Sequence, residues 1–169
     1  MLRGLVTPSN ELSPVSTPLG SNPTELRRLH FEDLAVGMTE TLLHTVTATH
    51  VEVFAELTGD RNPIHLSDDY AATTQFKTRI AHGAYTASLI SAVLGTRLPG
   101  PGAIYASQTL NFRAPVRIGD TVEVSVAVAE LVPERFRARL VCICAVRSEV
   151  VLDGEAVVKV PSIAAVRRG

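Results

Sequence analysis

The spacing of hydrophobic residues predicts helices in the middle of the chain. Apolar residues within 53–57 fall on one face of a helix that Gly59 ends. Thr49 and Glu52 are three positions apart and predict a capping box at the start of that helix. A second, short helix is expected from Ser67 to about residue 74, because Ser67 suits an N-cap and two aspartates follow it.

A third helix, predicted for residues 84–95, has a different character. It follows His82-Gly83 and carries no charged side chain on any face. A helix that is apolar or small all round is expected to be buried. Its many small side chains would let another backbone approach closely. The run Leu98-Pro99-Gly100-Pro101-Gly102 then ends it.

From residue 104 onward the hydrophobic pattern predicts strands. The predicted strands cover residues 104–112, 121–131, 136–146 and 155–160. Valines alternate with more polar residues between Val122 and Val128, and an earlier strand is expected at 39–46. Asp153-Gly154 and Ile118-Gly119-Asp120 are typical of tight turns. One uncharged helix and an antiparallel sheet curved around it place the fold in the α+β class.

Composition narrows the range of functions. The chain has 169 residues, 46% of them hydrophobic, and a formal net charge of −1, which fits one globular domain. The balanced charge and the absence of tryptophan argue against nucleic acid as a partner, and the apolar runs are too short for a membrane span. Cys142 and Cys144 have no metal-ligand spacing, so we expect no metal and reduced thiols in a cytoplasmic protein.

The ends of the chain are expected to lie outside the domain. Residues 1–28 are rich in Ser, Thr, Pro, Asn and Gly without sustained periodicity, which predicts a flexible tail. A signal peptide is not expected, because no apolar stretch follows Arg3. The domain should then span residues 29–163, with residues 164–169 as a C-terminal tail.

One stretch between the first two helices carries groups suited to acid–base chemistry. Residues 59–65 read Gly-Asp-Arg-Asn-Pro-Ile-His. Gly59 tolerates unusual backbone angles and Pro63 fixes its own φ, so we do not expect a regular helix here. Such a bend can direct Asp60 and His65 to one point. The same residues also suit an ordinary helix end followed by a loop, and the stretch alone does not separate the two interpretations.

Three motifs in order resemble one family. Residues 57–65 resemble the hydratase motif of the MaoC-like, (R)-specific enoyl-CoA hydratases, and residues 79–83 and 112–116 resemble that family's later segments. The resemblance covers residues 31–161. It implies a hot-dog fold, an antiparallel sheet wrapped around a central helix, usually as a homodimer. It also implies a hydro-lyase that carries out reversible syn addition of water to short- or medium-chain trans-2-enoyl-CoA, giving (R)-3-hydroxyacyl-CoA.

The resemblance also implies roles for individual residues. Asp60 and His65 would form the catalytic pair, with Asn62 holding their loop. Gly83 would receive the thioester oxygen with its backbone N–H, and Ser91 would support the aspartate. These roles agree with the chemistry, because hydration needs a base, an acid and stabilisation of negative charge. A backbone N–H at a helix N-terminus suits the last task.

Substrate contacts are expected at three further positions. Leu94 and its neighbours on the helix should set the depth of the acyl pocket. Arg113 and Arg79 are expected to bind the phosphates of coenzyme A, because a near-neutral chain must supply cations locally. Coenzyme A is then part of the substrate, and no separate cofactor is expected. The remaining histidines are expected to have structural or surface roles: His30, His44, His50 and His82.

Two other classes of function stay open. Hot-dog thioesterases and acyl-carrier-protein dehydratases depend on a carboxylate on or entering the central helix, and residues 82–95 contain none. A non-catalytic acyl-binding module is the other alternative, against which the complete Asp60 and His65 pair argues. The sequence does not indicate the acyl chain length, the carrier or the physiological direction of the reaction.

Overall fold

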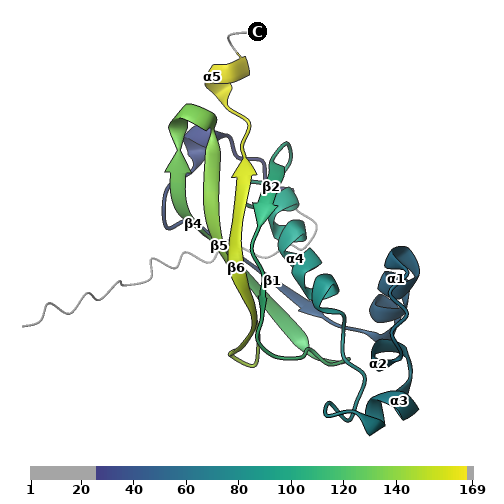
Figure 1. Ribbon diagram of the computed structural model, residues 1–169. Coiled ribbons are helices and arrows are strands. Elements are labelled where there is room, and N and C mark those ends of the chain that lie inside the picture. Colours follow the sequence, from purple (N-terminus) through teal and green to yellow (C-terminus); the bar gives the residue numbers. More distant parts are fainter. Residues whose placement is uncertain (1–25, 167–169) are drawn as a thin grey trace, which may run out of the picture.

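The computed structural model describes residues 26–166 and has the expected α+β hot-dog architecture. Its helices are η1 (Phe31–Asp33), α1 (Ala48–Thr58), α2 (Pro63–Leu66), α3 (Asp68–Thr73), α4 (Gly83–Thr96), η2 (Pro133–Arg135) and α5 (Ile163–Val166). Its strands are β1 (Thr39–Thr45), β2 (Ile104–Gln108), β3 (Asn111–Phe112), β4 (Thr121–Val132), β5 (Arg137–Val146) and β6 (Glu149–Lys159). Figure 1 shows α4 lying along the sheet, with α1–α3 grouped at one end.

The six strands form one antiparallel sheet in the order β1-β4-β5-β6-β2, and β3 also pairs with β6. The alternation expected on β4 is confirmed, because Val122, Val124, Val126 and Val128 are at most 2% exposed. These valines pack with Ile90 of α4 in one hydrophobic core. Burial of each such side chain stabilises the fold by about 1.5–3 kcal/mol.

Helix α4 is buried on one face only, so the expectation of burial all round is wrong for this single chain. Leu89, Ile90 and Val93 are buried against the sheet, whereas Ser91 and Ala92 are exposed. One curved sheet covers only one side of a helix. The exposed side carries small residues, which leaves room for another backbone.

Helix α1 begins earlier than the sequence predicted. Thr47 is its N-cap, and the hydroxyl of Thr47 accepts a hydrogen bond from the backbone N–H of His50 at 3.2 Å. The N–H of Thr47 in turn donates to His50 Nδ1 at 3.3 Å. A reciprocal Thr–His pair therefore replaces the expected box of Thr49 and Glu52, because an imidazole nitrogen accepts a hydrogen bond as a carboxylate does.

The turn between β5 and β6 is Arg147-Ser148, and the prediction of a turn at Asp153-Gly154 is wrong. Both turn residues have positive φ, 49° and 70°, as a two-residue hairpin requires. Gly154 lies inside β6, where a Cβ would stand 1.8 Å from the carbonyl oxygen of Thr109. Close backbone approach explains this glycine. The same crossing at Thr109 divides the expected strand 104–112 into β2 and β3.

Both ends of the described chain contact the domain. The N–H of Arg27 donates to the carbonyl of Thr96 at 2.8 Å, whereas residues 1–25 of the expected tail lie outside the described residues. The carboxylate of Glu32 accepts hydrogen bonds from the Ser162 hydroxyl and from two N–H groups of α5. The Ser162 hydrogen bond is the largest cause that lowers the pKa of Glu32 to about 2.

Two further findings bear on the environment of the chain. Cys142 and Cys144 are buried and free, and burial raises the pKa of their thiols to about 11 and about 12. Within residues 26–166, no helix is long and apolar enough to cross a membrane.

Candidate active site

A short loop after α1 carries the carboxylate of Asp60. Gly59 ends α1 with a left-handed φ of 77°, and Asp60 follows as an exposed residue. Asp60 Oδ1 accepts a hydrogen bond from the N–H of Asn62 at 3.3 Å, and Asn62 Oδ1 accepts one from the N–H of Ile64 at 3.2 Å. Asn62 is therefore the N-cap of α2, in contact with both sides of the loop.

His65 lies in a single turn of helix. Pro63 is the first residue of α2, so the expectation that residues 59–65 contain no regular helix is wrong from Pro63 onward. Proline is well tolerated at this position, since its φ suits a helix and its missing N–H is not needed there. The turn carries His65 inward, to 9% exposure.

The hydrogen bonds of His65 define which nitrogen faces the site. Its Nδ1 lies 2.8 Å from the carbonyl oxygen of Ile80, which can only accept, so Nδ1 carries the proton. Desolvation is the largest cause that lowers the pKa of His65 below its ordinary value of 6.5, and the neighbouring His82 lowers it further. The hydrogen bond to Ile80 and the charge of Asp60 act in the opposite direction and raise the pKa. At pH 7 the ring is neutral, and Nε2 has a lone pair that can accept a proton.

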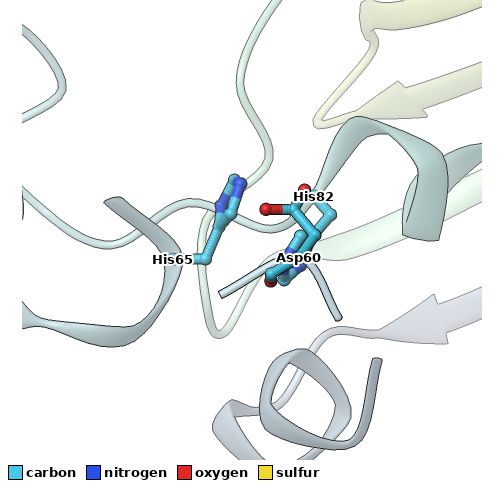
Figure 2. Close-up of side chains that lie close together, drawn as sticks. All are labelled: Asp60, His65 and His82. Atoms are coloured by element: carbon cyan, nitrogen blue, oxygen red, sulfur yellow. The ribbon is translucent and has the colours of Figure 1, made fainter. Parts of the chain in front are cut away.

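His82 contacts both of the expected catalytic residues. Its Nε2–H donates to the backbone carbonyl of Asp60 at 2.9 Å, and its ring stacks on His65 with centroids 3.8 Å apart at 33°. Figure 2 shows the side chains of Asp60, His65 and His82 close together, with the Asp60 carboxylate beside the His65 ring. Each of the three has a polar atom within 4.8 Å of the others.

The same three side chains are the ones in residues 26–166 close enough to share a cation. A metal binds the lone pair of a ring nitrogen, which lies in the plane of the ring. The rings of His65 and His82 face one another instead, and His82 Nε2 is engaged by the carbonyl of Asp60. This arrangement suits proton transfer better than metal coordination.

Gly83 is the first residue of α4, so its N–H has no acceptor within the helix and stands at the positive end of the helix dipole. The ring of Phe112 lies directly against it. A Cβ at position 83 would be 2.8 Å from Phe112 Cε1, closer than side chains tolerate. Glycine at this position therefore leaves room for an aromatic ring beside a free N–H.

His65 and Gly83 form part of the wall of one cavity of about 560 Å³. The rest of the wall is mostly apolar and comes from the 76–86 segment, the 112–116 segment and β6: Phe76, Ile80, Ala81, Ala84, Thr86, Phe112, Arg113, Ala114, Pro115, Val116, Val151 and Leu152. A mostly apolar pocket with a few polar groups is typical of a small-molecule site. The acid–base group therefore adjoins a pocket of a kind that suits an acyl chain.

Two expected site residues lie further along α4. Ser91 is exposed and eight residues beyond Gly83, a distance of about 12 Å along a helix, so the single chain does not bring it to Asp60. Leu94 is 3% exposed in the hydrophobic core and is not part of the cavity wall. In this chain the cavity lies at the N-terminal end of α4.

The two expected phosphate-binding arginines are both paired with carboxylates. Arg79 contacts Asp68 at 3.0 Å and Glu52 at 3.8 Å, and its side chain is 17% exposed. Arg113 makes two hydrogen bonds to Asp153, at 2.6 and 3.2 Å, but its side chain is 56% exposed and lines the cavity. Of the two, only Arg113 stands at the pocket with an accessible guanidinium.

Sequence reasoning missed the aromatic residues of the site. Phe112 belongs to the motif in which we singled out Arg113, and an aromatic residue in a motif was an available signal. Phe76 lies in a loop without any pattern, and nothing in the sequence marks it as a wall residue. His82 was expected to be structural, and its contacts with Asp60 and His65 depend on a fold that periodicity cannot give.

Comparisons with known proteins identify a family for this chain. The MaoC like domain matches residues 37–143, more than half of the chain. A 3-hydroxybutyryl-CoA dehydratase of Methylorubrum extorquens is 73% identical over 137 residues, covering 81% of this chain and 87% of the relative. An (R)-specific enoyl-CoA hydratase of Rhodospirillum rubrum is 53% identical over 133 residues, covering 79% and 92%.

A solved structure is similar to this chain in fold. The unliganded R-hydratase PhaJ1 of Pseudomonas aeruginosa superposes with a TM-score of 0.78 at 41% identity, covering 81% of this chain and 88% of that one. The family match includes the loop of Asp60, the turn of His65, and Gly83. The chain therefore belongs to the MaoC-like domain family and has its hot-dog fold.

Proposed function

We propose that this chain is an (R)-specific enoyl-CoA hydratase, a hydro-lyase that interconverts trans-2-enoyl-CoA and (R)-3-hydroxyacyl-CoA. The observation that carries this proposal is the meeting of a carboxylate, a neutral imidazole and a helix N-terminal N–H beside one apolar pocket. The names of the two relatives at 73% and 53% identity support the same reaction in its two directions.

In the proposed reaction, Asp60 and His65 bind one water molecule. His65 Nε2 takes a proton from the water as its oxygen bonds to C3 of the enoyl group, and the electron pair of the double bond moves toward the thioester. The imidazolium then returns the proton to C2. Addition is syn because one water delivers both the hydroxyl group and the proton from one face. The charge on Asp60 orients the water and stabilises the imidazolium.

Gly83 is proposed to stabilise the negative charge on the thioester oxygen. Its N–H is free at the positive end of α4 and lies at the wall of the mostly apolar cavity. Donors of this type are worth about a hundred- to a thousandfold in rate. The proposed chemistry uses protein groups and water, with coenzyme A as part of the substrate and no separate cofactor or metal.

The pocket supports short to medium acyl chains. Phe76, Phe112 and Leu152 line it, and large side chains at these positions limit how far a chain can extend.

Arg113 is the arginine that we propose for a contact with the phosphates of coenzyme A, since it is exposed at the cavity wall. Its pairing with Asp153 fixes the direction of the guanidinium, and the carboxylate offsets part of its positive charge.

We also propose that the protein acts as a homodimer in the cytoplasm. β2 is an edge strand with exposed residues along most of its length, and Ile104 (60% exposed) and Phe112 (57%) add apolar surface near it. Unpaired edges and apolar patches of this kind are usually covered by a partner. The exposed small-residue face of α4 adds to the surface that a second copy could cover.

Hydration of enoyl thioesters tests the proposal. Purified protein should consume crotonyl-CoA, measured as loss of the enoyl absorbance, and a series of crotonyl-, hexenoyl- and decenoyl-CoA should show activity falling with chain length. The same acyl groups on acyl carrier protein identify the carrier. Release of free coenzyme A without hydration would indicate a thioesterase and would contradict the proposal.

A further inference from the structure

His82 contacts every part of the proposed catalytic group. Its Nε2–H donates to the carbonyl of Asp60 at 2.9 Å, and its ring stacks on His65 at 3.8 Å. It is also the N-cap residue of α4, directly before Gly83. One side chain thus links the carboxylate loop, the catalytic imidazole and the start of the helix that carries the proposed N–H donor.

The ring of His82 is fixed on several sides. It is 2% exposed, and Phe54 packs against it with centroids 5.1 Å apart. Its Nδ1 is buried without a hydrogen-bond partner within residues 26–166. His82 therefore makes one hydrogen bond, through its Nε2–H, and one face of its ring packs against His65.

The position of His82 in the helix shows that it is not there to cap α4. N-cap residues are usually Ser, Thr, Asp or Asn, whose side chains accept hydrogen bonds from the first turn. The side chain of His82 makes no such bond. It donates across to Asp60 instead, so the chain forgoes a stabilising cap for a contact with the catalytic loop.

We propose that His82 is a positioning residue that sets the separation and orientation of Asp60 and His65. The inference rests on the proposed hydratase function. The N–H of His82 holds the backbone of the Asp60 loop, and its ring limits rotation of the His65 imidazole, so that both groups reach one water molecule. Loss of either contact lets the pair drift, and a misplacement of about 1 Å can cost on the order of a hundredfold in rate.

Two substitutions separate this role from a merely structural one. His82→Asn supplies a good N-cap, so α4 should be as stable as in the wild type or more so, but the shorter amide loses the stacking on His65. His82→Phe retains a ring against His65 and loses the N–H to Asp60. The matched control is His50→Phe, which alters a histidine in the neighbouring aromatic cluster of His44 and Tyr85.

The measurements are kcat and KM for crotonyl-CoA, the melting temperature and an NMR titration of His65. We expect His82→Asn and His82→Phe each to lower kcat at least about tenfold with KM within about threefold, and His50→Phe to keep kcat within about twofold. In both His82 variants the pKa of His65 should rise, because His82 lowers it in the wild type.

The kinetic and titration results each have an outcome that would overturn the proposal. Folded His82→Asn and His82→Phe variants that both keep more than half of kcat would overturn the proposal, as would kcat losses that only follow a loss of folded protein. A loss in one variant alone assigns the positioning to the N–H or to the ring. If the wild type does not hydrate enoyl-CoA, the proposed function fails. The His65 titration then decides separately whether His82 sets the environment of that ring, and an unchanged titration would overturn the proposal.

Discussion

Two pairs of histidines pack ring against ring in this protein, and only one of them fits a catalytic site. His65 and His82 have centroids 3.8 Å apart, and His44 and His50 have centroids 4.9 Å apart. Both pairs lie beside aromatic residues, and Phe54 contacts His82 on one side and Tyr85 on the other. Burial lowers the pKa of His65 and also that of His44, so a shifted pKa does not distinguish them.

The difference lies in the surroundings of the Nε2 atom of each histidine. His44 Nε2 is hydrogen-bonded to the Tyr85 hydroxyl at 2.6 Å, which leaves it satisfied inside the protein. The Nδ1–H of His65 donates a hydrogen bond to the backbone carbonyl of Ile80, so Nε2 stays available beside Asp60 at the wall of a cavity. A lone pair open to a pocket and close to a carboxylate supports His65 as the proposed catalytic histidine, whereas burial and stacking are common to both pairs.

Substitution of one histidine from each pair is expected to give the largest difference in kcat. His65→Gln should lower kcat by about a hundred- to ten-thousandfold, since it removes the group that we propose takes the proton from water. His44→Gln should leave kcat within about twofold, because His44 bonds to Tyr85 away from the pocket. Steady-state kinetics on crotonyl-CoA measure both. Equal losses in the two variants would remove the distinction between the pairs.

Gly83→Ala should produce the next largest effect. The added methyl would lie 2.8 Å from the ring of Phe112, so either the ring or the start of α4 must move. We expect kcat/KM to fall about ten- to a hundredfold as the N–H donor is displaced. Combining it with Phe112→Ala relieves the contact. Substantial recovery in the double variant would show that the ring, rather than the approach of the substrate, requires glycine.

The pH dependence of kcat/KM should follow the titration of His65 and not that of His44. Since the pKa of His65 lies below 6.5, the base stays neutral at neutral pH, and kcat/KM should fall only as the pH drops through that lower value. NMR should find His44 titrating below 6.5 as well, but without an effect on the rate. An acid limb above pH 6.5 would contradict this assignment of the base.

The smallest expected effect concerns the two arginines. Arg113→Ala should raise KM for crotonyl-CoA severalfold with little change in kcat, and should not affect a truncated pantetheine thioester. Arg79 is mostly buried between Asp68 and Glu52, so Arg79→Ala should lower the melting temperature more than it changes KM. If Arg113→Ala impairs both substrates equally, Arg113 does not contact the nucleotide end.

Much of the fold could be predicted from local patterns. The alternating valines of β4, the uncharged helix α4 and the left-handed end of α1 at Gly59 each follow from spacing or from one residue's backbone freedom. The prediction of a turn at Asp153-Gly154 was wrong because that glycine is required by the close approach of the Thr109 backbone, which is far away in sequence. Local patterns cannot report such a contact.

The site was predictable to a smaller extent. Asp60 and His65 stand in a motif, and the fold brings them together. The role of His82 depends on a hydrogen bond and a ring contact across 22 and 17 residues of chain. The carboxylate partners of Arg79 and Arg113 likewise come from other elements. Residue type and spacing indicate which groups are present, but the geometry decides which of them are free to act.

Hydration of crotonyl-CoA in D₂O tests the central claim most directly. If one neutral His65 and one water carry out the addition, the product is (R)-3-hydroxybutyryl-CoA with one deuterium at C2, on the same face as the new hydroxyl group. Chiral analysis gives the configuration at C3, and the proton coupling between C2 and C3 gives the face of addition. A single syn (R) product that Asp60→Asn and His65→Gln both abolish is the predicted result. An (S) or racemic product, anti addition, or full activity in either variant would contradict the account.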